Sequence, residues 1–223
     1  MQKESSQKPT VFIIDDDEAV RDSLKLLLDS VGQKNKTFSN AEYFLETYDE
    51  SCPGCLILDI RMPNMSGLEL QSKLNEMHCI LPVIFITGHG DVPMAVRAIK
   101  EGAMDFIQKP FRDQELLDLI NDALKLDAKQ RTNLLERKEI LQRISSLSDR
   151  EYEILQLIIQ GKPNKLIATE IGLSQRTVEI HRSHLMKKMG TKSLAHLVRQ
   201  IMVIKSHMSP DFSFLDEKIN KRT

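Results

Sequence analysis

Acidic residues follow two short apolar runs in the first half of the sequence. Asp59 follows the run 55–58, and Asp15 and Asp16 follow the run 11–14. Short apolar runs of this kind are typical of buried strands in a parallel sheet, where ligands bind beyond the carboxyl ends of the strands. Because Mg²⁺ prefers oxygen ligands, acidic residues at two neighbouring strand ends could bind one Mg²⁺ ion together.

Two other predicted strands end in residues that could bind a phosphoryl group. Thr87 follows the run 83–86, and Lys109 follows the segment 106–108. A carboxylate such as Asp59 can attack phosphorus to form an acyl phosphate, while a hydroxyl and an ammonium group stabilise the phosphoryl oxygens. Each residue alone would more simply be a turn or a helix cap. Together, at neighbouring strand ends, they predict a phosphoryl-acceptor site with Asp59, Thr87 and Lys109 as its catalytic residues.

Charge divides the chain. Residues 1–126 contain 21 acidic and 13 basic residues, a net charge of −8, whereas residues 145–223 contain 8 acidic and 13 basic residues, a net charge of +5. A basic second half favours binding to a polyanion, but the charge difference by itself is weak evidence for it.

Length and composition bound the class of protein. A chain of 223 residues suggests one or two domains, at about 150 residues per domain. The sequence has no apolar run of about 18 residues and no apolar signal-peptide core, so we expect a cytoplasmic protein outside the membrane. Cys52 and Cys55 have the C-x-x-C spacing of a redox pair or half a metal site. Without a second such pair nearby, we favour Cys55 as a small apolar strand residue.

Residues 10–125 resemble the receiver domain of two-component response regulators, and the FixJ-type subgroup in particular. The resemblance is carried by the segments 11–21 (VFIIDDDEAVR), 56–63 (LILDIRMP), 87–96 (TGHGDVPMAV) and 103–111 (AMDFIQKPF). It implies an α/β fold, a flavodoxin-like and doubly wound sheet of five parallel strands. It also implies that a sensor histidine kinase phosphorylates Asp59.

The same resemblance implies a Mg²⁺ site around Asp59. Asp16 would bind the ion directly, and Asp15 would assist through a water molecule. Asp59 and the backbone carbonyl of Arg61 would be the other protein ligands. Arg61 and His89 would also flank the path of the water that hydrolyses the phosphoryl group.

The resemblance further implies a conformational switch. Thr87 would move toward the phosphoryl group, and Lys109 would pair with it, next to a cis Lys109–Pro110 bond. Phe106 would be the aromatic switch residue. Because Phe106 lacks the hydroxyl of the tyrosine found in many receivers, any switch at this position would depend on packing alone.

A long helix is predicted in the middle of the chain. No Gly or Pro interrupts residues 112–143, and apolar residues recur there at helical spacing. The part up to residue 126 would complete the receiver, and residues 127–145 would form a charged helical linker. The linker could simply separate two domains or could pack against a second copy as a coiled coil, and the imperfect heptad over 127–133 leaves both possibilities open.

The second half has the pattern of a helix-turn-helix. Ser148 and Glu151 form a capping box that predicts a helix to about residue 160. Three more helices are predicted, at 164–170, 175–189 and 193–205. A tight turn containing Gly172 joins the first two of these three, as in helix-turn-helix motifs. The inward stripe of the longest one is predicted to contain Val178, Leu185 and Met189.

Residues 146–205 resemble the DNA-binding module of the LuxR/NarL type. The resemblance is carried by the segments 147–151 (LSDRE), 164–168 (NKLIA), 173–181 (LSQRTVEIH) and 187–190 (KKMG). It implies an all-α, four-helix domain whose third helix enters the major groove of double-stranded DNA, usually as a dimer on a two-fold site.

Positions on the third helix and beside it suggest which residues contact DNA. The residues expected to face the bases are Glu179, Ile180 and Ser183, and those expected to contact phosphates are Lys165, Thr177, Arg182 and Lys187. Arg176 adds a further basic DNA-binding residue. His181 could contact either part of the DNA or could pack. Glu179 could accept a hydrogen bond from cytosine N4 or could be a solvated acid paired to a lysine or arginine one turn away.

Together these patterns predict a phosphorylation-dependent transcription activator rather than an enzyme. It would have an extension (1–9), a receiver (10–126), a linker (127–145), a DNA-binding domain (146–205) and a loose tail (206–223). Phosphorylation would make it a homodimer or would release its DNA-binding half. On promoter DNA it would act on RNA polymerase. One rival, a haloacid-dehalogenase-like phosphatase, needs a second aspartate where Arg61 stands. The other, a regulator with a vestigial receiver, would not require the complete acid, threonine and lysine set.

Overall fold

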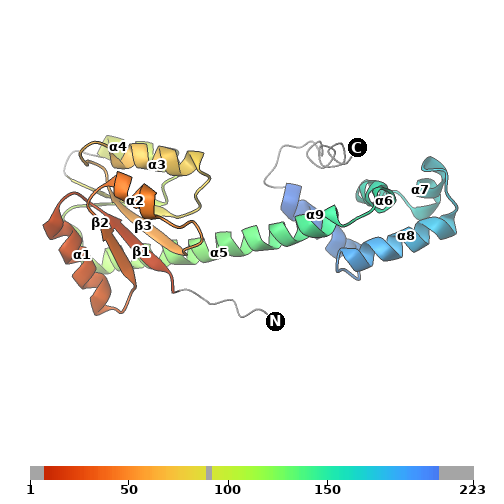
Figure 1. Cartoon of the computed structure of the whole chain (residues 1–223), viewed down its shortest axis with the longest axis horizontal. Helices are drawn as coiled ribbons and strands as arrows, with labels where there is room; N and C mark the ends of the chain where they lie inside the picture. Colours follow the sequence, from red (N-terminus) through yellow and green to blue (C-terminus); the bar gives the residue numbers. More distant parts are fainter. Residues whose placement is uncertain (1–7, 89–91, 206–223) are drawn as a thin grey trace. The chain divides into compact units, whose positions relative to one another are not determined.

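The computed structural model describes residues 8–88 and 92–205 (Figure 1). The chain divides into two compact units between Thr132 and Asn133. The predicted tail, His89 and all but the last two residues of the predicted extension lie outside the described residues.

The first unit contains a five-stranded parallel sheet with the order β2-β1-β3-β4-β5. The strands are β1 (Thr10–Ile14), β2 (Asn35–Phe38), β3 (Gly54–Asp59), β4 (Val83–Thr87) and β5 (Asp105–Gln108). The helices are α1 (Glu18–Ser30), α2 (Ala41–Thr47), α3 (Gly67–Glu76), α4 (Val92–Lys100) and α5 (Asp113–Ser145). The predicted doubly wound fold is confirmed. Its strand order reverses between β1 and β3, where such folds bind ligands.

Helices cover both faces of the sheet (Figure 1). Alternate strand residues such as Val11, Ile57 and Ile84 pack with α1 and α5 on one face. Their neighbours, such as Phe12 and Leu58, pack with α2, α3 and α4 on the other. Because the central strands are buried on both sides, they have the continuous apolar sequences from which they were predicted.

A glycine lets α3 begin close to the end of β3. A Cβ atom at Gly67 would lie 2.2 Å from the backbone oxygen of Asp59. The Gly67 N–H donates to the Ile60 carbonyl at 3.0 Å, and Ser66 and Glu69 form a capping box at the helix start. The backbone around Asp59 is therefore held by a close helix–strand contact.

The predicted long helix is observed as α5, which is continuous over 33 residues. Asp127 is 1% exposed and belongs by its contacts to the first unit. Ile140 and Ile144 belong to the apolar core of the second unit. The predicted linker, 127–145, therefore contains core residues of both units, and residues 132–136 between them are exposed.

The second unit contains the four predicted helices. They are α6 (Asp149–Ile159), α7 (Asn164–Glu170), α8 (Gln175–Lys188) and α9 (Leu194–Lys205). The capping box of Ser148 and Glu151 is present, and Val178, Leu185 and Met189 are buried as predicted. In the part of the chain that the structure describes, no helix is long and apolar enough to cross a lipid bilayer.

Candidate acidic site and helix-turn-helix surface

Two carboxylates and an ammonium group converge at the carboxyl edge of the sheet. Asp15 directly follows β1 and Asp59 ends β3, the two strands between which the order reverses. The Lys109 Nζ donates to Asp15 Oδ2 at 2.9 Å and to Asp59 Oδ1 at 3.1 Å. Lys109 follows β5, so three separate strands position the charged atoms of this site.

Backbone and side-chain donors hold both carboxylates in place. The N–H of Asp17 donates to Asp15 Oδ1 at 2.9 Å, and the N–H of Arg61 donates to Asp59 Oδ2 at 2.7 Å. The Asp15 side chain is 3% exposed and the Asp59 side chain is 13% exposed. Asp59 is therefore the carboxylate of this pair that a reactant in solution reaches more easily.

The electrostatics of the site favour a reactive carboxylate. Burial raises the pKa of the Asp59 carboxyl above its usual value, and the charge of Asp15 adds to this, against the opposing effects of Lys109 and the Arg61 N–H. Burial opposes the charge of Lys109, but the two carboxylates outweigh it and raise the pKa of Lys109. Lys109 therefore stays an ammonium group, and Asp59 is a partly desolvated carboxylate beside it.

Thr87 and Phe106 lie on neighbouring strands beside the site. Thr87 is fully buried, and its hydroxyl donates to the Gly88 carbonyl at 3.4 Å. Its own carbonyl accepts the Lys109 N–H at 2.7 Å, next to the cis Lys109–Pro110 bond. Phe106 is half-buried against the core of the α2, α3 and α4 face. Thr87 therefore contacts the Lys109 backbone in space, and Phe106 lies on β5 just before Lys109 in the chain. Their roles as a switch stay predictions.

The oxygen donors at this edge fit a hard cation. Among residues 8–88 and 92–205, no group of three or more His, Cys, Asp or Glu side chains is arranged to hold a metal. The side chains of Asp16 and Arg61 are exposed. Mg²⁺ usually keeps several waters and binds through one or two carboxylates together with phosphate oxygens. The pair of Asp15 and Asp59 meets that smaller requirement.

The second unit presents the exposed face of α8. The side chains of Arg176, Glu179, Ile180, Ser183 and Lys187 are exposed, as is that of Lys165 on α7. Ile180 is 50% exposed although it is apolar, which suits contact with another molecule. The five residues of α8 share one surface, because the opposite face of α8 is buried by Val178 and Leu185.

Three other predicted contact residues are held by neighbours. The Arg182 guanidinium donates to Asn164 Oδ1 at 2.8 Å. Thr177 is half-buried at the start of α8, where its N–H donates to Ser174 Oγ at 3.1 Å. His181 is also half-buried. Arg182 is therefore pre-positioned at the junction of α7 and α8.

Both units match known protein families. Residues 11–121 match the response regulator receiver domain, and residues 145–201 match the luxR family of bacterial regulatory proteins. The response regulator protein TmoT of Ectopseudomonas mendocina is 47% identical over 195 residues, which cover 87% of this chain and 89% of TmoT. The chain is a two-component response regulator.

Relatives of this response regulator include transcriptional regulators. The transcriptional regulatory protein FixJ of Rhizobium meliloti is 44% identical over 193 residues, which cover 86% of this chain and 95% of FixJ. A solved structure of response regulator StyR has 47% identity and a TM-score of 0.78, and it covers 88% of this chain and 99% of the StyR chain. The response regulator is therefore a DNA-binding regulator of transcription, in a family that is not a family of enzymes.

Sequence patterns missed several polar partners in this response regulator. Gln175 donates to Glu179 Oε1 at 3.2 Å, so the partner of Glu179 one turn away is an amide and not the lysine or arginine that was considered. Asn164, which binds Arg182, was also missed. Gln175 and Glu179 are a regular i, i+4 pair of one helix, whereas Asn164 and Arg182 are 18 residues apart on two helices. Nothing in the sequence alone distinguishes either pair from other solvated polar residues.

Proposed function

We propose that the protein is a phosphorylation-dependent transcription activator that receives a phosphoryl group on Asp59 from a sensor histidine kinase. The supporting observation is the convergence of Asp15, Asp59 and Lys109 at the edge where the strand order reverses. Asp59 is the more exposed carboxylate of the pair. A carboxylate and an ammonium group with this geometry suit phosphoryl acceptance, because both charges are already in place.

The transfer would use Asp59 as the nucleophile. A bond forms between an Asp59 carboxylate oxygen and phosphorus while the bond from phosphorus to the imidazole nitrogen of the kinase breaks. Asp15, Asp16, Asp59 and the Arg61 carbonyl would hold Mg²⁺, which supplies positive charge to the phosphoryl oxygens. Lys109, which pairs with Asp15 and Asp59 before the transfer, would then pair with the phosphoryl group.

The modified site would change the packing of its surroundings. The Thr87 hydroxyl would exchange the Gly88 carbonyl for a phosphoryl oxygen. Phe106 would follow into the space that Thr87 leaves. The face formed by α4, β5 and α5 would then repack and pair with a second copy of the protein. This is a shift between two populations, driven by the stronger binding of the phosphoryl group in one of them.

The dimer would bind promoter DNA through α8 and recruit RNA polymerase. Glu179, Ile180 and Ser183 would face base edges, where Glu179 can accept from cytosine N4 and Ile180 can contact a thymine methyl group. The residues proposed for phosphate contacts are Lys165, Arg176, Thr177, Arg182 and Lys187. His181 would lie at the edge of this surface, where it is half-buried.

Two substitutions on α8 should separate phosphate contacts from base contacts. We expect Arg182→Ala to weaken binding to every DNA sequence and to lower the salt slope by about one. We expect Glu179→Ala to change the preference at one base pair by about 1–3 kcal/mol. Fluorescence anisotropy titrations over a salt series, on a library of single-base variants of the bound site, measure both effects.

Arg150→Ala is the matched control, because Arg150 is an exposed arginine of α6 paired with Glu153. It should change neither quantity. If Glu179→Ala leaves all base preferences unchanged, Glu179 is a solvated partner of Gln175 and does not read DNA.

In vitro transcription tests whether the protein activates. A template carrying the bound site, purified RNA polymerase and Mg²⁺ should give more transcript when beryllofluoride, which mimics a phosphoryl group on aspartate, is added. A fall in transcript on the same template would contradict the activator role and identify a repressor.

A further inference from the structure

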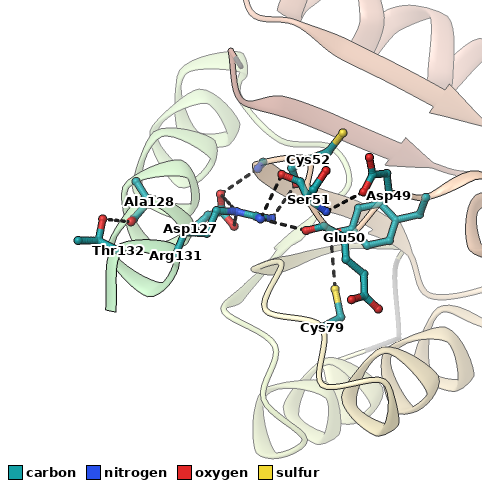
Figure 2. Close-up of polar contacts among 11 residues, drawn as sticks. Asp49, Glu50, Ser51, Cys52, Cys79, Asp127, Ala128, Arg131 and Thr132 are labelled. Atoms are coloured by element: carbon teal, nitrogen blue, oxygen red, sulfur yellow. Dashed lines mark hydrogen bonds and ion pairs between the residues drawn. The ribbon is translucent and has the colours of Figure 1, made fainter. Parts of the chain in front are cut away.

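A polar network holds α5 to the receiver at the edge of the sheet opposite Asp59 (Figure 2). Asp127 is buried, and its Oδ2 accepts the N–H of Gly54 at 2.9 Å. The Nε of Arg131 donates to both carboxylate oxygens of Asp127, at 2.9 and 3.0 Å. A buried carboxylate is costly unless it is paired and hydrogen-bonded, and these donors meet both conditions.

Arg131 also binds the loop that precedes β3 (Figure 2). Its Nη1 donates to the carbonyls of Glu50 at 3.0 Å and Ser51 at 3.4 Å, and its Nη2 donates to the carbonyl of Cys52 at 2.7 Å. The planar guanidinium group reaches three consecutive carbonyls and a carboxylate at once. A lysine ammonium group is a single point donor and could not do so. We call Asp127, Arg131 and residues 49–54 the α5 anchor.

The loop of the α5 anchor is itself attached to the apolar core. Tyr48 stacks on Phe44 with ring centroids 5.0 Å apart and meets the edge of Phe12 at 5.5 Å. The Cys79 thiol lies 3.8 Å from the Tyr48 hydroxyl. Burial, and the neighbouring Cys79, raise the pKa of Tyr48 far above its usual value, against the opposing effect of Arg131. The packing of the neutral Tyr48 ring on Phe44 and Phe12 attaches the start of the loop to the core.

The anchor continues the inward stripe of α5 in polar form. The apolar part of that stripe is Leu116, Ile120 and Ala123, and Asp127 and Arg131 occupy the next helical positions. The anchor meets β3 at Gly54, and β3 carries Asp59 at its other end. A buried ion pair adds little stability compared with apolar residues, but it can fix one register of a helix.

We propose that the α5 anchor positions the output helix: Arg131 is a positioning residue that ties α5 to the strand bearing Asp59. Without it, α5 would detach from the receiver between residues 127 and 132. Phosphorylation would then still occur but would be passed on poorly to the DNA-binding domain. The expected effect on DNA binding rests on the proposed function, whereas the existence of the α5 anchor does not.

Hydrogen exchange of the full chain tests the anchor. In Arg131→Ala, we expect the amides of 127–132 and 49–54 to exchange about tenfold faster than in the wild type, because the local opening free energy falls. The central strands beyond Gly54 should be unchanged. Arg131→Lys keeps the charge and should lose most of the same protection from exchange. It replaces Arg131→Ala in the test if the alanine variant folds poorly. Lys129→Ala, an exposed residue of the same helix, is the control. Unchanged exchange in both Arg131 variants would overturn the anchor.

Two functional measurements distinguish a positioning role of Arg131 from a purely stabilising role. Labelling of the Arg131 variants by acetyl phosphate should equal that of the wild type, whereas the stimulation of DNA binding by beryllofluoride should fall about tenfold or more. Faster exchange with intact stimulation would overturn the positioning role. If the wild type shows no stimulation, the proposed function fails, and the exchange measurement still decides whether the anchor exists.

Discussion

Replacing Asp59 with asparagine is expected to reduce phosphoryl uptake from acetyl phosphate to background. The amide is close in size, and its single oxygen can still accept one of the two hydrogen bonds that Lys109 and the Arg61 N–H donate to the two Asp59 oxygens. It lacks the negatively charged oxygen that must attack phosphorus. Mass spectrometry of the intact chain after incubation with acetyl phosphate and Mg²⁺ measures the uptake directly.

Asp17→Asn is a control from the same acidic edge. Asp17 is exposed and caps α1 by accepting the Ala19 N–H at 2.9 Å, and asparagine caps helices about as well as aspartate. This variant should be labelled like the wild type. Retained labelling of Asp59→Asn would show that another residue is the acceptor and would remove the basis of the proposed switch.

Replacing Gly67 with alanine is expected to destabilise the receiver by about 3 kcal/mol or more. The added Cβ would lie 2.2 Å from the Asp59 backbone oxygen. It would also lie 3.0 Å from a Phe85 ring carbon and 3.1 Å from a Leu58 side-chain carbon. Because the core around this site is close-packed, the added atom fits only if α3 or the end of β3 moves. Calorimetry of the full chain should show the receiver transition at a lower temperature.

Ser66→Ala is the matched control at the same helix start. It removes the side-chain acceptor of the Glu69 N–H without adding an atom near β3, so it should cost only about 0.5–2 kcal/mol. If Gly67→Ala costs no more than Ser66→Ala, the end of β3 is freer to move than its contacts indicate.

The central strands could be predicted because they are buried on both faces. The runs around Ile13, Leu58 and Phe85 are apolar throughout, and the structure places each in the sheet. β2 left no comparable signal, since it is an edge strand with the sequence NKTF in which only Phe38 is buried. The number of strands was therefore available from the family resemblance and not from periodicity.

The residues of the acidic site were predictable in identity but not in their contacts. Strand-end positions brought Asp15, Asp59 and Lys109 to one edge, because neighbouring parallel strands end on the same side. No pattern indicated that Lys109 bridges both carboxylates. Asp127 and Arg131 interrupt the apolar heptad pattern of the predicted helix, because they are polar residues at inward positions. The sequence alone therefore did not indicate that they are paired and that Asp127 is buried. Their partners outside α5 include residues 73 and 81 positions away in the chain.

Sedimentation most directly tests the claim that Asp59 is a switch whose output is dimerisation. Wild type and Asp59→Asn are compared with Mg²⁺, each with and without beryllofluoride. We predict that the wild type alone shifts from monomer to dimer when beryllofluoride is added. A shift in both proteins, or in neither, would contradict the claim. The first result would place the effect outside Asp59, and the second would show that dimerisation is not the output.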